Sequence, residues 1–161
     1  MKSRILIAFG FVAVSVLLSA YYWELLPCRM PMHFNAAGVV DGWAPKHQAL
    51  IAFPALITFM ALIYLAGFSV NHNRGYWKRK VRKPVSDEAL EILIRESQKV
   101  IDFVFLVVLA MFLYLHEAVI RIALGRAQTI VPGIWIFLGL LFAGLIYLGG
   151  RTIILQYRLL K

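Results

Sequence analysis

The side chains best suited to binding chemistry lie together in one polar stretch, Leu26–Lys46, between two strongly apolar runs. His33, Asn35, Asp41 and Lys46 supply an imidazole, an amide, a carboxylate and an ammonium group. Such groups could bind a metal ion or a polar ligand, although the His-Glu-x-x-His spacing of a zinc helix is absent. Asn and Asp near glycine also favour turns, in which their side chains accept backbone hydrogen bonds. From these residues alone, a ligand site and a structural turn both stay open.

A second ionisable group lies late in an apolar run, where His116 and Glu117 are followed by Arg121. Ionisable side chains in a membrane span are costly and usually face the bundle interior or water. His116 and Glu117 are therefore candidate partners for the polar stretch. Together with His33 and Asp41 they are the candidate metal ligands. The alternative is an i,i+4 ion pair between Glu117 and Arg121 near the headgroups.

No catalytic residue is predicted from these patterns. The chain has a single cysteine, and no nucleophile–base pair or phosphate-binding loop is visible in it. Its acids gather at the ends of the apolar runs and do not form an ion path across them. An enzyme or transporter that uses His33, His116 and Glu117 stays an alternative, and a metal ion is the only cofactor considered.

The elements that must position these residues are membrane helices. The chain has 161 residues, is 61% hydrophobic and has a mean hydropathy of +0.77, whereas soluble domains are about 45–50% apolar. We predict one all-α integral membrane domain over residues 1–161, with four transmembrane helices and an ordered extracytoplasmic loop between the first two. The expected spans are about residues 5–23, 49–70, 100–122 and 132–150.

The loop between the first two spans, residues 24–48, contains three prolines that exclude a regular helix. Pro54 is expected in or near the first turn of the second span, where a missing amide hydrogen costs little.

Residues 71–99 are expected to form a cytoplasmic basic loop followed by an amphipathic helix. Ser86 precedes two acids and predicts the start of this helix, which we expect to continue without a break through Ile122. Asp102 is expected at the solvated inner boundary of the third span.

The distribution of Lys and Arg predicts the orientation. Thirteen of the 17 lie at the termini or in residues 71–99, and the other four lie in the outer loop or around the end of the third span. By the positive-inside rule both termini are cytoplasmic, in a multi-pass protein of the inner (plasma) membrane. The basic loop is expected to contact anionic lipid headgroups and not nucleic acid. The small-residue pairs Ser15/Ser19 and Gly139/Ala143 would permit close helix packing, within one chain or in a homo-oligomer.

The polar stretch also carries a motif, Pro-x-x-x-Pro-x-His-Phe-Asn followed by Gly, Asp-Gly-Trp and Lys. Its residues are Pro27, Pro31, His33, Phe34, Asn35, Gly38, Asp41, Gly42, Trp43 and Lys46. This motif resembles the opening domain of the SdpI-type bacterial immunity proteins, over Tyr21–Phe68. The resemblance implies that the motif residues form a site and that the protein contributes to resistance against a secreted toxic peptide.

Three functions follow from these observations. The first is a binding or resistance module whose outer loop recognises a peptide, an envelope component or a partner protein. The second is an accessory subunit of a larger membrane complex, and the third is an enzyme or transporter with a His/Glu site. The expected site lies at the outer end of the bundle, where His33, Asn35, Asp41, Trp43 and Lys46 would meet His116 and Glu117. The structural alternative is a loop that only covers the helix ends, with Trp43 as its plug.

Overall fold

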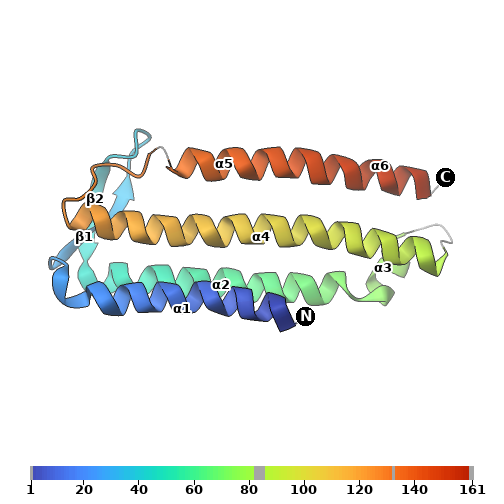
Figure 1. The fold of residues 1–161 in the computed structure, drawn as a ribbon, viewed down its shortest axis with the longest axis horizontal. Helices are drawn as coiled ribbons and strands as arrows, with labels where there is room; N and C mark the ends of the chain where they lie inside the picture. The colour runs from blue at the N-terminus through green and yellow to red at the C-terminus, as the bar shows by residue number, and fades with distance from the viewer. Residues whose placement is uncertain (1, 82–85, 132, 160–161) are drawn as a thin grey trace.

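The fold is a bundle of long helices with a β-hairpin at one end, as the computed structural model shows (Figure 1). The structure describes residues 2–81, 86–131 and 133–159. Within these residues, four helical segments are long and apolar enough to cross a membrane. They contain α1 (Lys2–Tyr22), α2 (Lys46–Asn71), α4 (Asp87–Ala123) and α5 (Gly133–Gly144), and α5 continues through the π-helical turn η2 (Leu145–Gly149) into α6 (Gly150–Leu159). The predicted all-α membrane class is confirmed.

The connection between α1 and α2 contains the hairpin. A short 3₁₀ turn, η1 (Trp23–Leu25), is followed by two antiparallel strands, β1 (Arg29–Phe34) and β2 (Val40–Pro45). An ordered loop is the sequence-based prediction for this connection, and the two strands were not predicted. At the opposite end of the bundle, the short helix α3 (Arg74–Lys80) lies in the connection between α2 and α4 (Figure 1).

The long helix α4 is the centre of the bundle. It packs against α1 and α2 on one side and against α5 on the other (Figure 1). Its 37 residues span about 55 Å at 1.5 Å per residue, so it extends beyond a hydrocarbon core of about 30 Å. Ser86 Oγ accepts a hydrogen bond from the Ala89 amide at 3.2 Å. The predicted cap and the unbroken helix through Ile122 are therefore confirmed, while Pro84 lies outside the described residues.

The second membrane helix begins earlier than expected. Since α2 starts at Lys46, Pro54 lies inside the helix and not in its first turn. A proline has no amide hydrogen, so the carbonyl of Leu50 loses its helical donor. Ser19 of α1 supplies one instead, with its Oγ 2.8 Å from the Leu50 oxygen. The proline within α2 is thus compensated by a hydroxyl from the neighbouring helix.

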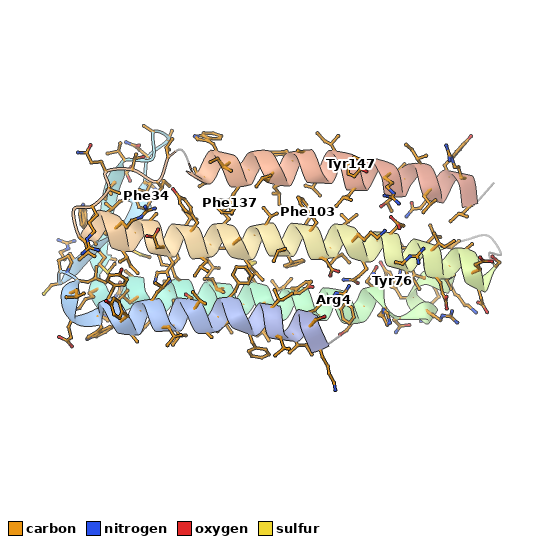
Figure 2. The ribbon with its side chains drawn as sticks, viewed as in Figure 1. Arg4, Phe34, Tyr76, Phe103, Phe137 and Tyr147 are labelled. Atoms are coloured by element: carbon orange, nitrogen blue, oxygen red, sulfur yellow. The ribbon has the colours of Figure 1, made fainter. Side chains whose placement is uncertain are left out.

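Close contact between α4 and α5 depends on two glycines. Gly133 lies against the Tyr114 ring and Gly144 against the Phe103 ring, and a Cβ at either position would overlap that ring. Figure 2 shows Phe103 and Phe137 lying between these two helices. The predicted small residue Gly139 has no neighbour within 4 Å of its Cβ position, so it does not bring helices together within this chain.

Candidate functional site

The polar stretch reverses direction through its turn-forming residues. Asn35 Oδ1 accepts hydrogen bonds from the amides of Ala37 and Val39, at 3.0 and 3.1 Å. Gly38 has a φ of 73°, in the left-handed region that favours glycine. Asn35 and Gly38 therefore shape the turn, as the structural interpretation of the sequence proposed.

His33 and Asp41 form a pair across the hairpin. The His33 Nδ1 atom lies 2.5 Å from Asp41 Oδ1, and the two side chains are 74% and 41% exposed. Gly42 is opposite His33 in the strand register, and a Cβ there would lie only 2.7 Å from the His33 Cβ. The close strand approach at Gly42 thus accompanies an imidazole–carboxylate unit that is open to solvent.

Trp43 follows Asp41 by two residues along β2 and is likewise exposed. Burial alternates along the strand, so that Asp41, Trp43 and Pro45 are exposed while their neighbours are half-buried. Asp41 and Trp43 are thus both exposed, although the pairing of the two strands is irregular around His33. Because Trp43 is 51% exposed, the interpretation of this residue as a plug is wrong.

The base of the hairpin is fixed to the helix ends. Met30 is fully buried, and Phe34 packs against the same apolar cluster of residues from α2 and α4. Lys46 Nζ donates hydrogen bonds to the carbonyls of Trp23 and Leu26, at 2.9 and 3.3 Å. The expected site residues Phe34 and Lys46 therefore hold the hairpin in place instead of facing a ligand.

A second attachment holds the tip of the hairpin. The amide of Ile130, in the connection between α4 and α5, donates to the Gly38 carbonyl at 3.3 Å. Val39 and Thr129 form an isolated β-bridge next to this bond. Tyr114 of α4 donates in turn to the Ile130 carbonyl at 2.8 Å. The hairpin is thus held at both ends and forms a rigid surface.

His116 is enclosed in the bundle core. It is fully buried, with Nδ1 2.9 Å from Ser15 Oγ and Nε2 3.3 Å from Ser19 Oγ. Its ring is stacked on Phe53, with 5.0 Å between centroids. This imidazole joins α1, α2 and α4, which is a structural role for a polar group in an apolar bundle.

Glu117 makes the ion pair that the sequence offered as an alternative. Its Oε1 atom lies 2.9 Å from Arg121 Nε, and both side chains are more than a third exposed. Among the described residues, no hydrogen bond or ion pair joins His33 or Asp41 to His116 or Glu117. The same part of the chain contains no group of three or more His, Cys, Asp or Glu side chains that could hold a metal ion. The structure thus brings the hairpin residues together without joining them to the α4 residues.

A charged cluster at the other end of the bundle was not predicted from the sequence. Asp102 was expected at a solvated boundary, but its carboxylate accepts from Arg4 at 2.6 Å, from Tyr64 at 2.9 Å and from Gln98 at 2.7 Å. The side chains of Arg4 and Asp102 are each 31% exposed. The sequence did contain a signal for this ion pair. Arg4 at the start of the first span and Asp102 at the start of the third are expected at the same membrane face.

A domain-family model matches one part of the chain. Residues 10–58 match a domain of unknown function, DUF1648. The match runs from within α1 through the complete hairpin into α2, and it leaves out His116 and Asp102. No curated protein and no solved structure matches the chain.

Proposed function

We propose that this protein is a membrane-embedded binding module whose hairpin recognises an extracytoplasmic peptide or protein segment. The observation that carries the proposal is the contrast between the two sides of the hairpin. Its base is locked to the helix ends through Met30 and Lys46, while its outer face exposes Trp43 and the His33–Asp41 pair. Exposed aromatic and charged groups on a rigid scaffold are typical of recognition surfaces.

The resemblance of the motif to SdpI-type immunity proteins supports a peptide as the ligand. An indole offers a large apolar contact area at a low entropy cost, and the His–Asp pair offers hydrogen bonds and charge. A secreted toxic peptide would meet this face first, and its capture would contribute to resistance. His33, Asp41 and Trp43 are the residues that we assign to contact the ligand.

The orientation is part of the same proposal. Thirteen of the 17 basic residues would lie on the cytoplasmic side if both termini face inward. The hairpin then faces outward from the inner membrane, and the basic residues around α3 meet anionic headgroups. Homo-oligomerisation and a permanent partner subunit are compatible with this arrangement.

Site-specific photocrosslinking in living cells tests the proposal. A benzophenone amino acid replaces Trp43 in one variant and Tyr147, which is 66% exposed on η2, in the control. We expect a light-dependent adduct with a peptide or protein at position 43 but not at position 147. Adding Asp41→Ala should abolish the adduct. Adducts with lipid alone at position 43 would mean that Trp43 is an interfacial anchor and would overturn the proposal.

A stability measurement separates recognition from a covering role. Asp41 is an exposed partner in a surface pair, and such pairs contribute little to folding. We therefore expect Asp41→Ala and Trp43→Ala each to keep the thermal midpoint of the wild type in detergent, although Asp41→Ala abolishes the adduct formed by the crosslinker at position 43. Parallel loss of stability and crosslinking would instead identify the hairpin as a structural cover. A stoichiometric membrane-protein adduct would indicate the accessory-subunit role.

A further inference from the structure

A pocket of about 540 Å³ lies at the end of the bundle opposite the hairpin. It is lined by the beginning of α1, the end of α2, the start of α3 and the first half of α4. At this end of the bundle, the described part of α1 does not reach as far as α4 does (Figure 1). The pocket is separate from the hairpin and uses none of its residues.

The pocket lining contains more basic than acidic side chains. Its charged side chains are those of Arg4, Arg74, Arg95, Lys99, Glu91 and Asp102. Arg4 is paired with Asp102 and Arg74 with Glu91, so both lining acids already have a cationic partner. Arg95 forms no hydrogen bond or ion pair within the part of the chain that the structure describes.

Arg95 and Lys99 both line the pocket. They are four residues apart on α4 and therefore lie on one helix face. Lys99 contacts Glu96 at 2.6 Å, but Glu96 also lies 3.5 Å from Arg151 of α6. Arg95 also attracts Glu96 electrostatically, beyond ion-pair distance. The charge of Glu96 is thus shared among three bases, so Lys99 and Arg95 keep capacity for an anion.

The remaining wall of the pocket consists of the polar residues His72 and Gln98 and an apolar part. Phe68 and Ile94 contribute to it, and the Arg4 guanidinium lies 4.9 Å from the centre of the Phe68 ring. Figure 2 shows Arg4 at this end of the bundle, beside α4. A ligand that fits must therefore combine an anionic group with an apolar body.

The position of the pocket along the helices matches the headgroup level of a membrane. Arg4 precedes the apolar run of the first span, Phe68 is near the end of the second, and Asp102 is near the start of the third. Residues from three separate parts of the chain therefore indicate the same depth of the pocket in the membrane. At that depth, basic side chains meet lipid phosphates, and apolar surface meets the first carbons of the acyl chains.

We propose that this pocket binds the headgroup of an anionic phospholipid. Arg95 and Lys99 contact the phosphate, and Phe68 and Ile94 contact the start of an acyl chain. The proposal is independent of the hairpin and of what the hairpin recognises.

Native mass spectrometry of the full chain in neutral detergent, titrated with phosphatidylglycerol or phosphatidylcholine, tests this site. The variant Arg95→Gln/Lys99→Gln removes the two proposed phosphate contacts. Its matched control, Lys2→Gln/Arg79→Gln, removes two exposed charges from the same end of the bundle outside the pocket lining. We expect phosphatidylglycerol affinity to fall roughly fivefold for each charge removed from the pocket, hence roughly 25-fold for both. The control should change it by less than about twofold.

Several outcomes would overturn the proposal. Equal losses in the two double variants would show general charge attraction without a site. Equal affinity for the two lipids would show that negative charge is not recognised, and displacement of the lipid by inorganic phosphate at similar concentration would assign the site to a free anion. If Arg95→Gln/Lys99→Gln unfolds in neutral detergent, Arg95→Lys keeps the charge and should retain binding, whereas the single variant Arg95→Gln should lose roughly fivefold.

Discussion

At the residue scale, the polar side chains in the interior of this bundle all form hydrogen bonds. Within the described residues, no buried side-chain nitrogen or oxygen lacks a hydrogen bond. Ser19 makes two of these bonds, one to the Leu50 carbonyl and one to His116. The bond to Leu50 has a local cause, because Pro54 cannot supply the helical donor.

We expect Ser19→Ala to lower the free energy of unfolding by about 1 kcal/mol, since it leaves the Leu50 carbonyl without a donor inside an apolar bundle. Ser69→Ala is the control, because Ser69 bonds to the Leu65 carbonyl on an exposed surface. Unfolding in detergent with increasing dodecyl sulfate measures both.

A double-mutant cycle with Pro54→Ala tests the cause of that loss. Alanine at position 54 restores the amide donor for Leu50, so Ser19→Ala should cost less in that background than in the wild type. An equal cost in both backgrounds would show that Ser19 acts only through His116.

At the scale of elements, the longest helix connects the two ends of the molecule. The C-terminal end of α4 contacts β1, and its N-terminal half lines the opposite pocket. Its start is set locally by Ser86, whose side chain accepts from the Ala89 amide. The first turn also carries Asp87 and Glu88, which are favourable at the positive end of the helix dipole.

We expect Ser86→Ala to destabilise the first turns of α4 by about 1 kcal/mol, because the amide at the helix start loses its acceptor. Hydrogen exchange of the amides in residues 87–95 should accelerate, while exchange in residues 105–115 stays unchanged. Ser86→Asp keeps an acceptor at the cap and should restore protection. Faster exchange throughout α4 would contradict a local capping role.

At the scale of the whole molecule, one charged cluster ties three helices together. Asp102 of α4 accepts from Arg4 of α1 and from Tyr64 of α2. Since the Arg4 and Asp102 side chains are each 31% exposed, water still screens part of this interaction. The cluster ties the start of α1 to α4 beside the pocket that Arg95 and Lys99 line.

We expect Asp102→Asn to lower the free energy of unfolding by roughly 2 kcal/mol, because Arg4 then keeps its charge without a carboxylate partner. Glu117→Gln removes a carboxylate from an exposed i,i+4 pair and should cost less than about 1 kcal/mol. Comparing both in the same unfolding assay checks the expectation, which equal losses would contradict.

The topology of the whole chain can be tested by labelling. In a Cys28→Ser background, we expect Ala37→Cys, in the exposed hairpin turn, to react with an impermeant maleimide added outside the cells. Arg79→Cys, on exposed α3, should react only after the membrane is permeabilised. The opposite pattern would invert the orientation derived from the basic residues.

Much of the architecture could be predicted from the sequence, because hydropathy and helix capping are local properties. The apolar runs identified the four spans, and Ser86 with its two acids identified the start of α4. The turn was likewise predictable from Asn35 and Gly38. The Asn35 side chain accepts backbone hydrogen bonds, and the Gly38 backbone adopts a positive φ. The error at Pro54 arose because a proline in the first turn and a compensated proline inside a helix have the same local sequence.

The sequence by itself therefore determined the membrane class, the order of the spans and the position of the turn. Only the tertiary structure decided which polar residues meet. Helices that are apolar all round, such as α1 and α2, carry no sequence signal for their rotation about their own axes. That rotation directs His116 to the serines of α1 and Asp102 to Arg4, instead of bringing His116 to the hairpin. Contacts between residues about one hundred positions apart depend on packing, which no local pattern encodes.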